Sequence, residues 1–74
     1  METQEFIKKL AEAIEIEENA NLTLKTEFRE LEEWGSLSVM LLIAFFDEEF
    51  GKEIGSADIK ACQTIQDLYN LSIA

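Results

Sequence analysis

Hydrophobic residues recur along most of this chain at intervals of three and four positions, which is the spacing of amphipathic α-helices. The first such segment runs from about Thr3 to Ile16, and we expect Thr3 to be its N-cap. Its apolar stripe is predicted to face the core, with charged residues on the opposite side. The stripe consists of Phe6, Ile7, Leu10, Ala11 and Ile14, and the charged side of Lys8, Lys9, Glu12 and Glu15.

A connection of unusual length follows, from about Glu17 to Gly35. A stretch this long without regular structure is uncommon in a compact domain and needs something that orders it. Apolar residues recur through it, so we expect them to hold the connection against the core as an ordered loop, with a helical turn between residues 28 and 33. They are Leu22, Leu24, Phe28, Leu31 and Trp34.

The third segment predicts a helix that begins at Gly35-Ser36, runs from Leu37 to Phe50 and stops at Gly51. At a rotation of about 100° per residue, this helix is apolar on two sides. One face holds Val39, Leu42, Ile43, Phe46 and Phe50, and roughly the opposite face holds Leu37, Leu41, Ala44, Phe45 and Glu48.

A helix that is apolar all round is normally buried, but a domain of a few short helices can hardly surround one of them. We therefore expect Leu37, Leu41 and Phe45 to be at least partly exposed. The alternative, that the loop and the last helices cover this face too, stays open at this point.

Two shorter segments complete the chain. Ser56 is expected to cap a helical turn over residues 57–59, and Thr64 and Asp67 have the spacing of a capping box that opens a final helix. Seventy-four residues give room for one core. The prediction is therefore a single all-α domain over residues 1–74: a small four-helix bundle, with three long helices, one short one, and a long ordered loop after the first.

Charge narrows the possible partners. The chain has 16 acidic and 6 basic residues, a net charge of −10. Nucleic acid and anionic lipid are poor partners for such a surface, because binding either one needs basic side chains that neutralise phosphates. Proteins with basic docking patches are better suited. The alternative is that the acids only keep a small protein soluble.

Composition also argues against an enzyme. The chain has no histidine and a single cysteine, Cys62, so it cannot build a Ser-His-Asp or Cys-His nucleophilic site, a disulfide or a His/Cys zinc site. We expect Cys62 to be buried or half-buried. Asp47–Asp58 has the length of an EF-hand loop but lacks its glycine and its final glutamate, so we reject a calcium site.

Without a basic N-terminal start or a membrane-spanning apolar run, a cytoplasmic monomer is expected.

The segment Trp34-Gly35-Ser36-Leu37 resembles the Asp-Ser-Leu attachment motif of acyl carrier proteins. As in that family, the motif stands at the start of a long second helix, which here ends in Asp47-Glu48-Glu49-Phe50-Gly51. The final helix, led by Thr64-Ile65-Gln66-Asp67-Leu68, is also similar to the family's, so the resemblance covers nearly the whole chain. Without that resemblance, Ser36 would be read as a plain N-cap.

The resemblance implies a free-standing, non-catalytic carrier that holds acyl intermediates as thioesters on a 4'-phosphopantetheine arm attached to Ser36, for fatty acid or polyketide-type synthesis. Gly35 and Leu37 would flank the attachment point. A phosphopantetheinyl transferase would add the arm, and acyl-loading and synthase enzymes with basic or apolar docking patches would use it. The implied docking residues are Leu37, Leu41, Phe45, Asp47 and Glu48.

Two positions depart from the family pattern. Gly35 stands where the family usually has aspartate, and Ser38 and Leu41 stand where fatty-acid carriers tend to have acids. Docking would then depend more on apolar contact than on ion pairs. The alternative function is an unmodified, carrier-like protein-interaction module whose apolar face binds one partner permanently. If modified, the carrier could also shelter an alkyl chain within a core of Leu10, Phe28, Val39, Ile43 and Phe46.

Overall fold

The computed structural model describes residues 2–16 and 21–74, and within them all regular structure is helical. The prediction of an all-α bundle with three long helices and one short one is confirmed. Residues 17–20, where the long connection was expected to begin, lie outside the described part. The elements in order are α1 (Thr3–Ala13), the 3₁₀ helix η1 (Phe28–Glu30), α2 (Ser36–Phe50), α3 (Ser56–Lys60) and α4 (Ile65–Ile73).

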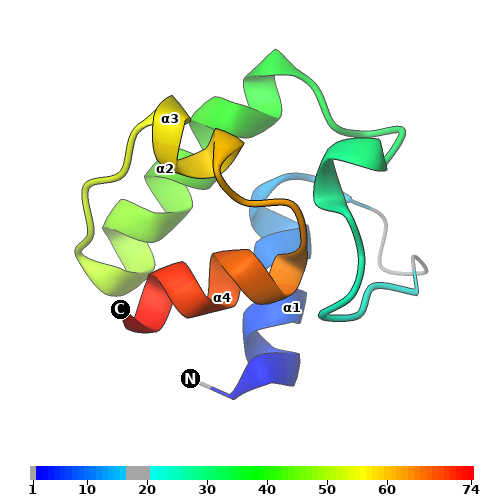
Figure 1. Cartoon of the computed structure of the whole chain (residues 1–74), viewed down its shortest axis with the longest axis horizontal. Helices are drawn as coiled ribbons and strands as arrows, with labels where there is room; N and C mark the ends of the chain where they lie inside the picture. Colours follow the sequence, from blue (N-terminus) through cyan, green and yellow to red (C-terminus); the bar gives the residue numbers. More distant parts are fainter. Residues whose placement is uncertain (1, 17–20) are drawn as a thin grey trace.

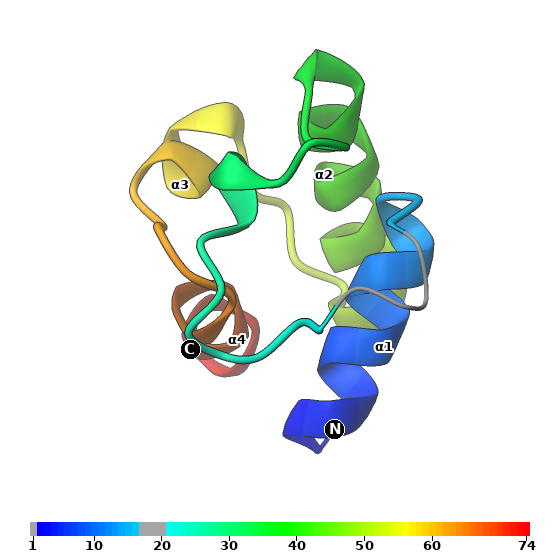
Figure 2. The same cartoon turned by 90° about the vertical axis from the view of Figure 1, so that its right-hand side faces the viewer.

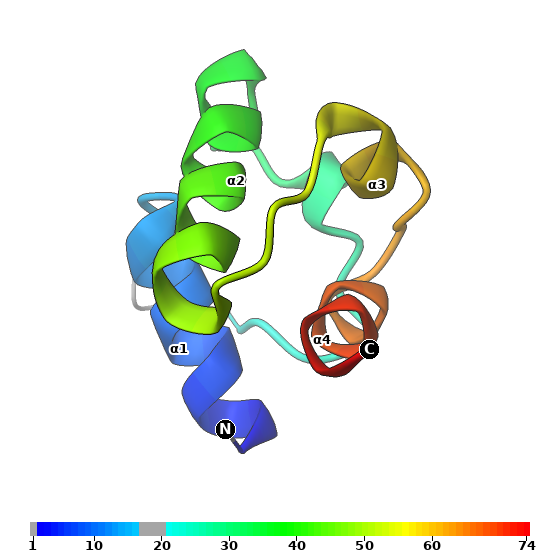
Figure 3. The same cartoon turned by 90° about the vertical axis from the view of Figure 1, so that its left-hand side faces the viewer.

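The helices form two groups that enclose one core. α1 packs against α2 and α4, and α2 packs against α3. Figures 2 and 3 show α1 and α2 on one side of the molecule, α3 and α4 on the other, and the loop before α2 running between them, whereas α3 overlaps α2 in the view of Figure 1. In all three views the first turn of α2 stands at the edge of the molecule, away from both termini.

Every helix contributes fully buried side chains to this core, and so does the loop. Burying an aromatic or aliphatic side chain of this size stabilises a fold by about 1.5–3 kcal/mol, so the shared core joins the short elements into one unit. The predicted stripe of α1 is confirmed, as is the burial of Cys62. The largest fully buried side chains are Phe6, Leu10, Phe28, Leu42, Phe46, Ile59, Ile65 and Leu68.

The loop is ordered by side-chain burial and by backbone hydrogen bonds to α4. Phe28 is fully buried, and its ring lies 5.0 Å from the ring of Trp34. At the start of α4, the N–H of Ile65 donates to the carbonyl of Thr26 (3.0 Å) and the N–H of Gln66 to that of Leu24 (2.8 Å). The loop thus satisfies two N–H groups that a helix N-terminus leaves without partners. The prediction of a packed loop with a helical turn is confirmed for residues 21–35.

Two predicted helix boundaries after α1 are also confirmed, namely the end of α2 at Gly51 and the capping box at the start of α4. Gly51 ends α2 in the left-handed conformation, with φ of 62°. Thr64 Oγ1 accepts the N–H of Asp67 (3.3 Å), and Asp67 Oδ2 accepts the N–H of Thr64 (3.1 Å), which closes the capping box at α4.

Two predicted N-caps are wrong by one residue. Glu2 caps α1 in place of Thr3, since its backbone is extended and its carbonyl accepts the N–H of Phe6 at 2.9 Å. Gly55 caps α3 in place of Ser56, and Asp58 Oδ2 accepts the Gly55 N–H at 2.9 Å. In both cases the hydroxyl residue is the first residue of the helix instead of its cap.

The C-terminus of α1 comes earlier than the predicted Ile16 because the chain turns there in a Schellman motif. Glu15 has a φ of 59°, and the N–H of Ile16 donates to the carbonyl of Ala11 (2.8 Å). Ile16 is buried, as the apolar residue after such a turn usually is. The left-handed conformation costs a non-glycine residue about 1–2 kcal/mol, so burial of Ile16 offsets local strain.

Replacing Glu15 with glycine should therefore stabilise the protein. We expect Glu15→Gly to raise the free energy of unfolding by about 1 kcal/mol, measured by urea denaturation. Glu15→Ala is the control, because it removes the same charge and keeps the backbone strain. Equal stabilisation by both variants would show that the charge, and not the left-handed backbone, is the unfavourable feature.

The capping carboxylate of α4 predicts a dependence of stability on pH. Hydrogen bonds from the N–H groups of Gln63 and Thr64 hold the pKa of Asp67 below its ordinary value of 3.8. The unfolded chain takes up the proton first as pH falls, so the stabilisation is complete at neutral pH and is lost below about pH 4. The stability difference between wild type and Asp67→Ala should shrink from pH 7 to pH 3. A pH-independent stability difference between wild type and Asp67→Ala would contradict the assignment.

Candidate functional site

The candidate site is the start of α2, which the loop presents at the edge of the molecule. Gly35 is the N-cap, with an extended backbone, and Ser36 is the first residue of the helix. The Ser36 side chain is exposed, and its hydroxyl makes no hydrogen bond to any described residue. The alternative that Ser36 is a plain N-cap is therefore wrong. Its hydroxyl is open to solvent instead of being used by the helix.

Ser38 provides the side-chain hydrogen bonds that cap the start of α2. Its Oγ accepts the N–H of Gly35 (3.1 Å) and donates to the carbonyl of Glu33 (3.2 Å), and the residue is only 4% exposed. The Ser38 N–H in turn donates to the Gly35 carbonyl at 3.0 Å. The Ser38 side chain thus supplies one half of a capping box, and together these hydrogen bonds fix the chain on both sides of Ser36.

From the sequence, Ser38 was noted only as a residue that stands where fatty-acid carriers tend to have an acid. The structure shows that Ser38 is buried beneath the helix start. The usual sequence signature of a capping box is a Ser, Thr, Asp or Asn cap followed three residues later by Glu or Gln. Gly35 and Ser38 do not have that signature, so nothing in the sequence indicated the role of Ser38.

The start of α2 suits a phosphate group. Among the described residues, the N–H groups of Ser36 and Leu37 have no backbone acceptor, and the dipole of a 15-residue helix favours negative charge beside them. No lysine or arginine occurs between residues 31 and 46, so backbone amides supply the attraction. A side chain at Gly35 would meet no atom within 4 Å, which indicates open space on that side. The residues present fit a phosphodiester on Ser36.

The structure separates the residues expected on the docking side. Leu37 is 60% exposed, Leu41 is half-buried, and Asp47 and Glu48 are exposed, as predicted. The expectation for Phe45 is wrong, because its side chain is only 5% exposed. Its ring packs edge-on against that of Phe6 at 5.9 Å, since α1 lies against that side of α2. Phe45 therefore stabilises the core and offers no surface to a partner.

A residue that the periodicity did not single out takes the place of Phe45. Met40 is 68% exposed and is the most exposed large hydrophobic side chain in the described part of the chain. It joins a continuous exposed strip on α2, which we call the α2 face. The α2 face consists of Leu37, Met40, Leu41, Ala44, Asp47 and Glu48.

Other groups show little reactive chemistry. Burial raises the pKa of the Cys62 thiol, and the carboxylates of Asp67 and Asp58 raise it further, so the thiol is protonated at neutral pH. Across residues 2–16 and 21–74, no cluster of three or more histidine, cysteine or acidic side chains is arranged to hold a metal ion. None of the described helices has the length and apolar character needed to cross a membrane.

Comparison with protein families gives one match of direct relevance to this site. Residues 4–71 match the family described as "phosphopantetheine attachment site". The match includes all four helices apart from the first residue of α1 and the end of α4. Comparison with curated proteins and with solved structures gives no match.

The different roles of the two neighbouring serines can be tested by stability. Ser38→Ala removes a donor to the Glu33 carbonyl and an acceptor for the Gly35 N–H, so it should lower the free energy of unfolding by about 1–3 kcal/mol. Ser36→Ala removes an exposed hydroxyl and should change it by less than about 0.5 kcal/mol. Urea denaturation followed by circular dichroism measures both. A larger loss for Ser36→Ala would reverse the two roles.

Proposed function

Because the chain belongs to the phosphopantetheine attachment site family, we propose that it is a carrier protein whose Ser36 hydroxyl bears the 4'-phosphopantetheine arm. Members of this family carry the arm covalently on a serine, which raises the question of which serine is used here. The chain offers four, Ser36, Ser38, Ser56 and Ser72, and the structure describes all of them.

Accessibility leaves Ser36 and Ser56 as candidates, and the length of the helix that each one begins favours Ser36. Ser38 and Ser72 are buried, and the Ser72 hydroxyl donates to the carbonyl of Tyr69 at 2.6 Å. Ser56 is exposed, but it begins a helix of five residues, whereas Ser36 begins one of fifteen. Only the longer helix gives a phosphate the benefit of a substantial dipole. The exposed, unbonded Ser36 hydroxyl is the observation that carries the proposal.

When bound, the arm supplies a terminal thiol that holds an acyl group as a thioester. The protein's own part is to position the attachment point. Ser38 holds the backbone on both sides of Ser36, and the amides of the first turn face the place where the phosphate would lie.

The α2 face is the proposed docking surface for those partners. It begins one residue after Ser36, so an enzyme bound there would have the arm beside it. Leu37 and Met40 give it an apolar start, and Asp47 and Glu48 give it an acidic end. We expect the transferase and the acyl-loading and synthase enzymes to present an apolar patch bordered by basic residues. Fatty acid or polyketide-type synthesis by a free-standing, cytoplasmic carrier is the use we propose.

We further propose that an attached alkyl chain enters the core beside Val39 and Ile43. Leu10, Phe28 and Phe46 are fully buried, whereas Val39 and Ile43 are half-buried against the core. Val39 and Ile43 lie on α2 within two turns of Ser36. An alkyl chain that enters beside them would exchange partly exposed surface for contact with the core.

A second candidate function follows from Gly35. Gly35 stands where this family usually has an acid before the serine. The exposed side chains of Leu37 and Met40 give the α2 face an apolar surface that would suit one permanent partner. In that case the chain would be an unmodified interaction module. The intact mass of the protein purified from its native host distinguishes the two functions, because only the carrier gains an arm.

Arm transfer tests the assignment of Ser36. Incubation with coenzyme A and a broad-specificity phosphopantetheinyl transferase should add one arm, as measured by intact-protein mass spectrometry. Ser36→Ala should abolish the addition, and Ser56→Ala, the control at the other exposed serine, should leave it unchanged. An arm that maps to Ser38 or Ser56, or an unchanged mass with several transferases, would disprove the proposal.

A further inference from the structure

The two sulfur-bearing side chains in the described part of the chain, Met40 and Cys62, differ in their access to solvent. Cys62 is 7% exposed, and burial together with the nearby carboxylates raises the pKa of its thiol. Because the thiolate is the form that attacks an oxidant, the folded structure protects Cys62. Met40 is 68% exposed, and its thioether has no proton to lose before it reacts. A dissolved oxidant therefore reaches Met40 more readily than Cys62.

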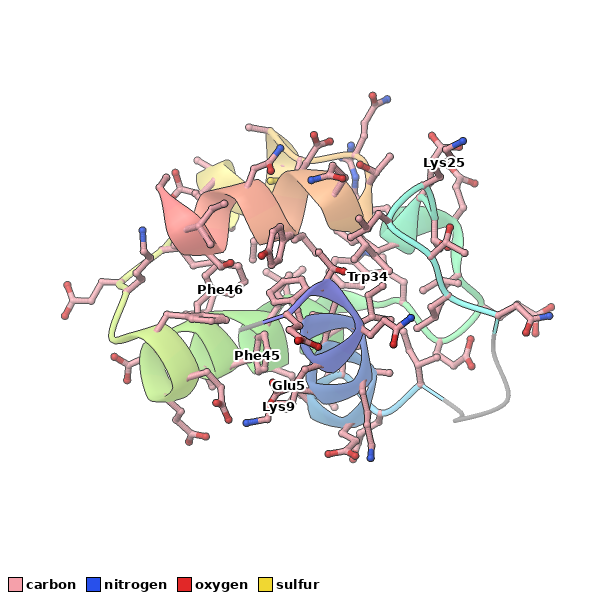
Figure 4. All side chains as sticks on the ribbon, turned by 90° about the horizontal axis from the view of Figure 1, so that it is seen from below. Glu5, Lys9, Lys25, Trp34, Phe45 and Phe46 are labelled. Atoms are coloured by element: carbon pink, nitrogen blue, oxygen red, sulfur yellow. The ribbon has the colours of Figure 1, made fainter. Side chains whose placement is uncertain are left out.

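Met40 lies on the α2 face, one helical turn from the proposed attachment point. It comes four residues after Ser36, so the two side chains lie on one side of α2, about 6 Å apart along the helix axis. Met40 is not among the hydrophobic side chains that pack against the core. In contrast, Phe45 is buried, and Figure 4 shows it at the boundary of α1 and α2 beside Glu5. A chemical change at Met40 would alter the surface of α2 and leave the core intact.

We propose that Met40 is an oxidation site, and that its reaction with hydrogen peroxide weakens docking of the transferase that modifies Ser36. The thioether sulfur attacks one peroxide oxygen and the O–O bond breaks, which yields methionine sulfoxide and water. The sulfur loses two electrons and the peroxide gains them. The inference rests on the proposed carrier function, which supplies the transferase, and it adds a redox control to the docking surface.

Oxidation changes what the α2 face offers to a partner. A thioether is apolar and flexible, whereas a sulfoxide has a strongly polar oxygen that an apolar partner surface would leave without a hydrogen bond. The exposed side chains of Leu37 and Ala44 lie on either side of Met40 along the helix, so this oxygen would stand in the middle of the apolar strip. The acidic end of the α2 face keeps its charge. The loss would therefore fall on apolar contact.

The test uses the protein without its arm, because the terminal thiol of the arm would itself react with peroxide. The protein is treated with hydrogen peroxide, the peroxide is removed, and transfer of the arm from coenzyme A by a broad-specificity transferase is measured. We expect peptide mass spectrometry to locate one added oxygen at Met40. The kcat/KM of transfer should fall roughly fivefold, the effect of losing one significant interface contact. Methionine sulfoxide reductases with a dithiol as reductant should restore it.

Two variants assign the effect to Met40. Met40→Leu keeps an apolar side chain of similar size but cannot take up oxygen, so its rate of transfer should be the same before and after peroxide treatment. This variant retains Met1, which lies outside the described residues, and so controls for oxidation there. Met40→Gln introduces a polar group without an oxidant and should accept the arm several-fold more slowly than Met40→Leu.

Three outcomes would overturn the proposal. They are an unchanged rate of transfer to the oxidised wild type, an equal loss in Met40→Leu, and a lower free energy of unfolding after oxidation in urea denaturation. The last would place the effect in the fold instead of in docking. Failure of transfer to the untreated protein is a different result, because it would reject the carrier function on which this inference rests.

Discussion

The placement of Ser36 depends on how the loop before α2 is held. Ordering each residue of such a loop costs about 1–2 kcal/mol of backbone entropy, so a loop of this length needs anchors. The fully buried Phe28 is one anchor, and the hydrogen bonds from the start of α4 to the carbonyls of Leu24 and Thr26 are the other. Each anchor also serves a second element, because Phe28 completes the core and the carbonyls satisfy α4. The loop is therefore part of the fold and directs α2 outward.

Helix α2 has more apolar sides than its neighbours can cover. α1 covers the side with Phe45, and α3 packs against another, which leaves Leu37 and Met40 in solvent. Exposed hydrophobic rows promote association in a small protein. A net charge of −10 opposes such association by mutual repulsion, and acidic side chains border the apolar strip. A partner that is apolar at its centre and basic at its rim matches both properties.

Two serines at the start of α2 have different structural roles. Ser38 is buried and provides the hydrogen bonds that hold the turn, whereas Ser36 is exposed and is left without a structural task. A hydroxyl that stabilised the helix could not be modified without loss of that stabilisation. Because Ser38 provides these hydrogen bonds, a modification of the Ser36 hydroxyl would leave them in place.

Features that depend on interactions between near neighbours in the chain could be predicted from the sequence. The stripe of α1, the capping box of Thr64 and Asp67, and the stop at Gly51 depend on helical periodicity and on hydrogen bonds between near neighbours. The family resemblance also came from the sequence, through the order of these same elements around Ser36. Burial of the loop's apolar residues followed because water disfavours them in any arrangement.

Which side of α2 faces solvent was decided only by the tertiary structure. Phe45 and Met40 are both apolar and lie on the same helix, and only the position of α1 buries the first and exposes the second. The early end of α1 and the capping role of Ser38 depended likewise on the left-handed backbone at Glu15 and the extended backbone at Gly35. Hydrophobicity favours the burial of a residue but does not specify which neighbouring element covers it.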